Sequence, residues 1–73
     1  MTSVEAVELL KEEMANGNEE VISFVEEILE KKFLRNFMKY PKAATRKEKE
    51  RFNSLVSSHI YDEELKKRLI ITN

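Results

Sequence analysis

The sequence of 73 residues has no cysteine, one glycine, one proline and one histidine. Without cysteine, neither disulfides nor a thiolate zinc site can stabilise the fold, and a cytoplasmic location is expected. The single glycine, Gly17, excludes the glycine-rich loops that hold phosphates. At this length we expect one domain with a thin core, formed by residues 1–73.

Long hydrophobic runs are also missing, and no apolar stretch approaches the roughly 20 residues of a membrane-spanning helix. The first ten residues contain Glu5 and Glu8, where a signal peptide would need positive charge followed by an apolar run. We therefore expect neither secretion nor a membrane span. Hydrophobic residues still make up 41% of the chain and include four Phe and two Tyr, which favours a folded protein over a disordered one.

Charges of opposite sign are separated along the chain. Residues 1–30 contain nine Glu and one Lys, a net charge of −8, and residues 31–51 contain nine Lys or Arg and two Glu, a net charge of +7. Residues 52–73 contain three acids and three bases, so the total is −1. Such asymmetry indicates either a basic face for an anionic partner, or two complementary halves that meet within one molecule or between two copies.

Signals for helix starts are present along the whole chain. Thr2 with Glu5, and Thr45 with Glu48, have the spacing of a capping box, in which each side chain accepts a hydrogen bond from the other residue's backbone N–H. Further N-caps stand at Asn18 and Asp62. Apolar residues recur at helical spacing, and no strand-like alternation occurs. The sequence predicts an all-α bundle of three to four helices over residues of about 3–15, 19–40, 46–60 and 63–71.

The predicted helix 19–40 changes its apolar face halfway. The apolar residues of its first half share one side and are Val21, Phe24, Val25 and Ile28. The continuation of that side carries Lys32, Arg35, Asn36 and Lys39. These residues cannot stay in the same core without burying charge, so the helix either breaks near Lys31 or packs its two halves against different neighbours. In helix 3–15, Val7, Leu10 and Met14 form the stripe, and Leu9 lies off it.

The residues needed for catalysis are scarce. Nucleophilic catalysis needs an activated side chain with a positioned base, and the only imidazole is His59, whose neighbours Ser57 and Ser58 do not face it on a helix. We interpret His59 as a partly buried member of a core stripe. Paired glutamates fall on outward faces and are expected to be solvated: Glu12–Glu13, Glu19–Glu20 and Glu26–Glu27. We expect no enzyme activity, metal, cofactor or small-molecule substrate.

The basic segment 31–51 is the best candidate for a binding site, because it combines its nine cations with Phe33, Phe37 and Tyr40. Cations neutralise phosphates or acidic side chains, and aromatic rings stack on bases or pack against a partner. The predicted partner-binding residues are Lys31, Lys32, Arg35, Lys39, Lys42, Arg46, Lys47, Lys49 and Arg51. We expect a small regulatory interaction protein whose partner is an acidic protein surface or a nucleic acid.

Two alternatives stay open. The first is a nucleic-acid-binding module in which helix 46–60 presents its cations to phosphates. The second is a purely structural homo-oligomer, which the thin core of a small cysteine-free chain favours. Self-association into a homo-oligomer is expected whichever function holds, because the segment 33–40 is apolar on most of its circumference. The predicted self-association residues are Phe33, Leu34, Phe37 and Met38.

Overall fold

The computed structural model describes residues 1–72, with Asn73 and the side chain of Phe33 outside the description. Residues 1–72 form five α-helices and a short 3-10 helix, and no strand. The elements are α1 (Ser3–Ala15), α2 (Glu19–Ile28), α3 (Lys32–Lys39), η1 (Pro41–Ala43), α4 (Arg46–His59) and α5 (Glu63–Leu69). The predicted all-α class is confirmed, and the predicted helix 19–40 is two helices separated by residues 29–31.

Local capping explains where most helices begin. Both predicted capping boxes form. In the first, Thr2 N donates a hydrogen bond to Glu5 Oε1 at a distance of 2.9 Å, and Glu5 N donates one to Thr2 Oγ1 at 3.2 Å. The Thr45 box has the corresponding distances of 2.8 and 3.2 Å. The carboxamide of Asn18 caps α2 and the carboxylate of Asp62 caps α5. These starts were predictable because each depends on residues within one turn.

The end of α1 requires the only glycine. Gly17 has a φ of +79°, in the left-handed region that residues with a side chain avoid. Its N–H donates a hydrogen bond to the Met14 carbonyl, and the N–H of Asn18 donates one to the Glu13 carbonyl, each with a donor–acceptor distance of 3.0 Å. This pair of bonds is a Schellman motif, which satisfies the last carbonyls of the helix. The chain then reverses into α2.

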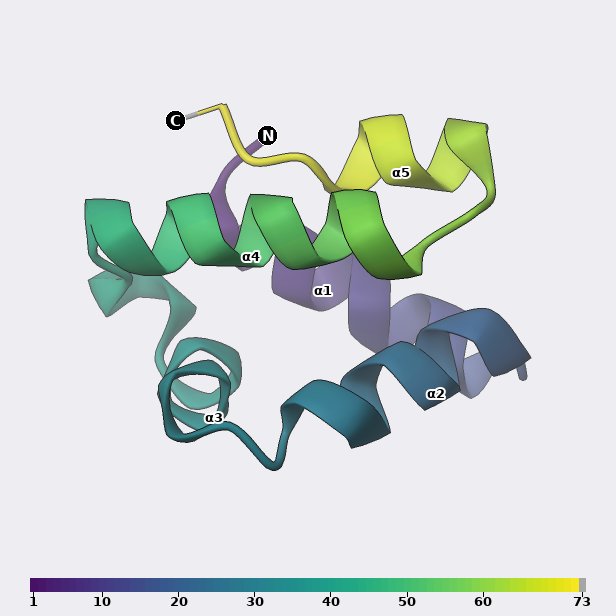
Figure 1. Cartoon of the computed structure of the whole chain (residues 1–73), viewed down its shortest axis with the longest axis horizontal. Helices are drawn as coiled ribbons and strands as arrows, with labels where there is room; N and C mark the ends of the chain where they lie inside the picture. Colours follow the sequence, from purple (N-terminus) through teal and green to yellow (C-terminus); the bar gives the residue numbers. More distant parts are fainter. Residues whose placement is uncertain (73) are drawn as a thin grey trace.

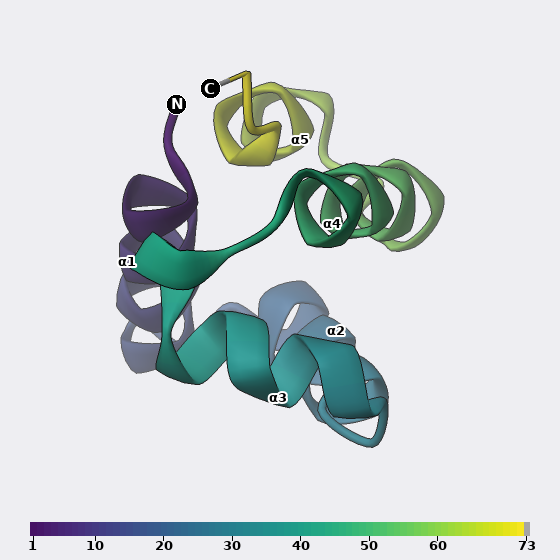
Figure 2. The same ribbon diagram turned by 90° about the vertical axis from the view of Figure 1, so that its left-hand side faces the viewer.

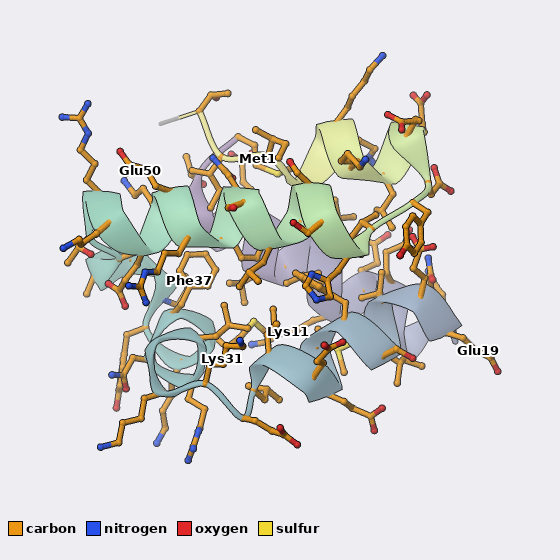
Figure 3. All side chains as sticks on the ribbon, viewed as in Figure 1. Met1, Lys11, Glu19, Lys31, Phe37 and Glu50 are labelled. Atoms are coloured by element: carbon orange, nitrogen blue, oxygen red, sulfur yellow. The ribbon has the colours of Figure 1, made fainter. Side chains whose placement is uncertain are left out.

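The break between α2 and α3 lets the second half of the predicted helix change neighbours. Lys31 is the N-cap of α3 and makes no side-chain cap hydrogen bond. After the break, Leu34 and Phe37 are buried and α3 packs against α4. Phe37 lies between these two helices (Figure 3), and its ring stacks on Phe52 with centroids 4.8 Å apart. The basic stripe of α3 thereby faces solvent, as its charge requires.

All five α-helices contribute to one hydrophobic core, and sixteen of the side chains that the structure describes are apolar and buried in it. Phe52 lies against both Phe37 and Phe24, and the Phe24 ring meets it edge-on at 6.2 Å. Leu9 lies off the predicted stripe of Val7, Leu10 and Met14, and we expected it to matter less for that reason, but it is only 6% exposed and belongs to the core. The reason is that α1 is covered by α2, η1 and α5 at once, which buries a wider arc of the helix than a single stripe.

The last residues leave the helix and pair with distant parts of the chain. We predicted a helix to residue 71, but α5 ends at Leu69. The Asn53 carboxamide accepts a hydrogen bond from Ile71 N at 2.8 Å and donates one to the Ile71 carbonyl at 2.9 Å. The backbone N–H of Thr72 donates a hydrogen bond to the Met1 carbonyl at 3.1 Å, and the N-terminal ammonium of Met1 donates one to Thr72 Oγ1 at 2.9 Å. The two chain ends therefore lie side by side (Figures 1 and 2).

Candidate functional site

The opposite charges of the sequence lie towards opposite ends of the molecule. Figure 1 shows the starts of α2 and α5 and the end of α1 at one end of the long axis, which measures 28 Å. The acidic first turns of α2 and α5 therefore share that end, where Figure 3 marks Glu19. The basic helix α3, η1 and the start of α4 lie at the other end (Figure 1). The result is a molecule with a marked electrostatic polarity.

The nine predicted partner-binding cations do not form one surface. Eight of them are exposed and Lys49 is half-buried. Lys31 and Arg51 line a shallow hollow between α3 and α4. Arg46 and Lys49 line another, beside the chain end, and Arg46 also pairs with Glu50 at 3.6 Å. Because α4 turns its cations to different sides and interleaves them with glutamates, its charge is spread around the helix.

A third hollow brings together cations and apolar side chains from three segments. We call it the α3 groove, and it has a volume of about 590 Å³. Its lining residues are Lys11 from α1, Leu29 from the α2–α3 connection, and Arg35, Asn36, Met38 and Lys39 from α3. Three of the six are cationic, and none of the described residues that line it is acidic. The α3 groove is therefore an electropositive hollow.

The chemistry of the α3 groove combines two kinds of contact. Leu29 is 36% exposed, a high value for a leucine, and Met38 packs only partly against the core. Both leave apolar surface beside the guanidinium of Arg35 and the ammonium groups of two lysines. A partner that places an acidic group on the cations and an apolar side chain between them satisfies both.

Lys11 lines the α3 groove although it was not among the predicted partner-binding residues. It is the single base among the nine glutamates of residues 1–30 and is exposed on α1. A single basic residue in an otherwise acidic segment was the one feature of the sequence that could have indicated its role. Its proximity to Arg35 and Lys39 depends on how α1 packs beside the α2–α3 connection, which periodicity within one helix does not reveal.

Two of the predicted self-association residues are not available to a second copy. Leu34 is 0% exposed and Phe37 is 1% exposed, both within the monomer core. The prediction that they form an intermolecular surface is therefore corrected, because the break near Lys31 turned them towards α4. Met38 is half-buried and lines the α3 groove, and the side chain of Phe33 lies outside the described residues.

His59 has the surroundings of a packed residue. Its ring is half-buried, 6.1 Å from the Phe24 ring, and Nδ1 lies 3.1 Å from the Leu55 carbonyl. Nε2 lies 3.5 Å from Glu27 Oε1. These contacts agree with the interpretation of His59 as a partly buried member of the α4 stripe. Across residues 1–72, no cluster of three or more acidic or histidine side chains is placed to hold a metal ion.

Glu20 has a structural role that the sequence did not indicate. We expected its carboxylate to be solvated, but it is half-buried, and Oε1 accepts hydrogen bonds from Tyr61 N at 3.1 Å and Asp62 N at 3.3 Å. The expectation is wrong because the α4–α5 connection presents amides that need an acceptor. Glu20 thereby ties the start of α2 to this connection.

Comparisons with known proteins add no relative. The chain matches no protein-family model, no curated protein and no solved structure. In the part of the chain that the structure describes, no helix has both the length and the apolar character needed to cross a membrane. The functional conclusion therefore depends on the geometry of the α3 groove and its neighbours.

Proposed function

We propose that this protein is a non-enzymatic interaction protein that binds an acidic protein segment through the α3 groove. The observation that supports the proposal is the lining of the groove, to which Lys11, Arg35 and Lys39 contribute charge and Leu29 and Met38 contribute apolar surface. The complementary ligand is an amphipathic segment with carboxylates on its flanks and an apolar side chain between them. Binding of this kind suits a regulator or inhibitor, which acts by occupying its partner.

Two features favour a protein partner over a nucleic acid. The apolar surfaces of Leu29 and Met38 have no counterpart in a phosphate backbone, whereas an apolar side chain fills the space between them. The cations of α4 alternate with Glu48 and Glu50, and Arg46 is paired with Glu50. Carboxylates next to a phosphate contact repel it, so α4 is a poor phosphate-binding helix.

Chemical-shift mapping with three probes tests the proposal. The first probe is a peptide of about 14 residues that carries Glu and Leu at amphipathic helical spacing. The second is a peptide of the same length made only of Glu, and the third is a DNA duplex of about 14 base pairs. We expect the Glu/Leu peptide to bind most tightly and to shift the amides of Lys11, Leu29, Arg35 and Lys39.

The probes separate the proposal from its alternatives. Equal affinity for the two peptides would show that apolar contacts are irrelevant and would overturn the amphipathic partner. Tighter binding of the duplex, with shifts centred on Arg46, Lys47 and Arg51, would replace the proposal with the nucleic-acid-binding module. If none of the probes produced a saturable shift at the α3 groove, the groove would not be the binding site.

A further inference from the structure

One exposed segment of this chain has the chemistry that the α3 groove accepts. Residues 61–64 read Tyr-Asp-Glu-Glu, and all four are exposed. Among the described side chains, Tyr61 is the most exposed of the large hydrophobic ones, at 78%. Three carboxylates follow it directly, so the segment places an aromatic ring beside acidic groups. We call residues 61–64 the Tyr61 segment.

The backbone of the Tyr61 segment is fixed although its side chains are exposed. The N–H groups of Tyr61 and Asp62 donate hydrogen bonds to Glu20 Oε1 at 3.1 and 3.3 Å. Asp62 Oδ1 in turn accepts hydrogen bonds from the N–H groups of Glu64 and Leu65 at 3.0 and 3.1 Å. These bonds tie the segment to α2 and α5, so binding costs little conformational entropy of its backbone. A tyrosine presented in this way is suited to anchor an interface.

The surroundings of Tyr61 extend the acidic character of the segment. Tyr61 lines a hollow of about 390 Å³ together with Glu19, Glu20 and Glu27 of α2 and His59 of α4. None of the described residues that line this hollow is a lysine or an arginine. Glu19 and Glu27 are both exposed. A partner that covers the Tyr61 ring therefore also meets carboxylates, which favours a cationic partner.

The α3 groove complements the Tyr61 segment in charge and in apolar character. The groove joins three cations of α1 and α3 to the apolar surfaces of Leu29 and Met38. The Tyr61 ring matches the apolar surfaces, and the carboxylates that follow it match the cations. The guanidinium of Arg35 can in addition stack on an aromatic face.

The two surfaces belong to opposite ends of one molecule. The Tyr61 segment leads from α4 into α5 at one end of the 28 Å long axis, and α3 lies at the other end (Figure 1). The lining of the α3 groove includes no residue of the segment. A contact between the two surfaces therefore requires two molecules. Each copy carries one groove and one segment, so each can act as receptor and as ligand.

We propose that the α3 groove binds the Tyr61 segment of a second copy of this chain. The inference rests on the proposed function, because it names an acidic segment that the same groove accepts. One small contact gives weak association, with a Kd of about 0.1–1 mM. The second copy therefore occupies the groove only at high protein concentration, and a tighter-binding segment of another protein displaces it.

NMR spectra of the full chain between about 20 μM and 2 mM test the proposal. We expect the amides of Arg35 and Lys39 to shift with the same midpoint as those of Tyr61 and Asp62, because both surfaces enter one contact. Excess Glu/Leu peptide should return the Tyr61 amide to its position in dilute protein, since the peptide displaces the segment. Spectra that do not change with concentration, or shifts confined to one surface, would overturn the inference.

A tyrosine variant and its control locate the contact. Tyr61→Ser should weaken self-association about tenfold or more, since an anchoring ring is lost, and should leave the melting temperature nearly unchanged because the ring is 78% exposed. The matched control is Tyr40→Ser, which removes a tyrosine ring that is 61% exposed and does not line the α3 groove. It should change self-association less than about threefold. Equal losses in the two variants would contradict the assignment of Tyr61.

A mixture of two defective variants tests the pairing of the surfaces. Arg35→Glu/Lys39→Glu keeps the Tyr61 segment, and Tyr61→Ser keeps the α3 groove. Each variant alone should be mostly monomeric at about 0.5 mM, whereas the mixture should contain a 1:1 dimer by sedimentation equilibrium. A mixture that stays monomeric excludes the second copy as ligand. The proposed function still stands if the Glu/Leu peptide shifts the groove amides of the wild type, and it fails as well if the peptide does not.

Discussion

At the scale of single residues, Asn53 anchors the backbone of Ile71. Its carboxamide makes both hydrogen bonds to the Ile71 backbone, which holds residues 70–72 against α4 and beside Met1. Asn53→Ala leaves one backbone donor and one acceptor of a buried residue unpaired. We expect a loss of about 1–3 kcal/mol in the free energy of unfolding, measured by urea denaturation.

The matched variant Asn53→Asp separates the two bonds. Aspartate keeps the acceptor for Ile71 N and loses the donor to the Ile71 carbonyl, so its loss of stability should be smaller than that of alanine. Faster hydrogen exchange of the Ile71 amide should accompany the alanine variant. Wild-type exchange at Ile71 in Asn53→Ala would mean that the chain end is held by other contacts.

Glu5 makes the start of α1 sensitive to acid. The hydrogen bond from the Thr2 backbone, followed by that from the Thr2 side chain, lowers the pKa of Glu5 from its ordinary value of 4.5. A folded-state pKa below the unfolded one stabilises the fold above the unfolded pKa, and this contribution is lost as the pH falls through the folded pKa. An NMR titration of the Glu5 carboxyl should give a midpoint below 4.5.

Removal of the titrating group should remove this part of the acid sensitivity. Glu5→Gln keeps a side-chain oxygen for the Thr2 N–H but cannot ionise. Its free energy of unfolding should therefore fall less steeply than that of the wild type as the pH drops below about 4.5. A Glu5 midpoint at or above 4.5, or identical acid profiles for the two proteins, would contradict this account.

At the scale of whole elements, α1 is held from several sides. Leu9 is buried although it lies off the stripe formed by Val7 and Leu10, because α2, η1 and α5 all pack on the helix. Leu9→Asp should therefore destabilise the fold by about 3 kcal/mol or more, since an unpaired carboxylate enters the core. Thermal or urea unfolding followed by circular dichroism measures this loss.

The exposed Leu29 provides the control for this substitution. Leu29→Asp makes the same chemical change at a side chain that is 36% exposed, and it should cost about 1 kcal/mol or less. Equal losses for the two variants would show that Leu9 is less buried than the fold indicates.

Whether a helix boundary could be predicted from the sequence depends on how far apart in the chain the interacting residues lie. The starts of α1, α2, α4 and α5 were predictable because capping depends on residues two or three positions away. The break near Lys31 was indicated by the charge on the continuing face of the helix. The early end of α5 was not, because Asn53 holds Ile71 from 18 positions away. No local pattern encodes such a bond.

The candidate site was predictable in composition but not in shape. The sequence marked the basic segment, and its α3 cations Arg35 and Lys39 do line the α3 groove. The packing of the helices decided which cations meet: Lys42 and Lys49 line one separate hollow, and Lys31 and Arg51 line another. Lys11 joined the groove from a segment that otherwise reads as acidic. Site geometry is a tertiary property, which one-dimensional charge patterns do not resolve.

At the scale of the whole molecule, polarity of charge sets what the protein repels and attracts. The net charge of −1 gives no overall attraction to an acidic partner. Because the acidic and basic ends are separated, the basic end attracts an acidic partner and the acidic end repels it. We therefore expect association to be fastest at low ionic strength. It should slow as salt is added, because the Debye screening length falls to about 10 Å at 0.1 M.

The affinity of the double variant Arg35→Glu/Lys39→Glu for the Glu/Leu peptide decides whether the α3 groove binds the acidic segment. Its control is Lys67→Glu/Arg68→Glu, two exposed cations of α5, which lies on the other side of the molecule from α3 (Figures 1 and 2). Each variant changes the net charge by −4, from −1 to −5. Fluorescence anisotropy should show at least about a tenfold loss of affinity for the α3 variant and less than about threefold for the α5 variant. Equal losses would show that only net charge matters, and the α3 groove would then not be the binding site.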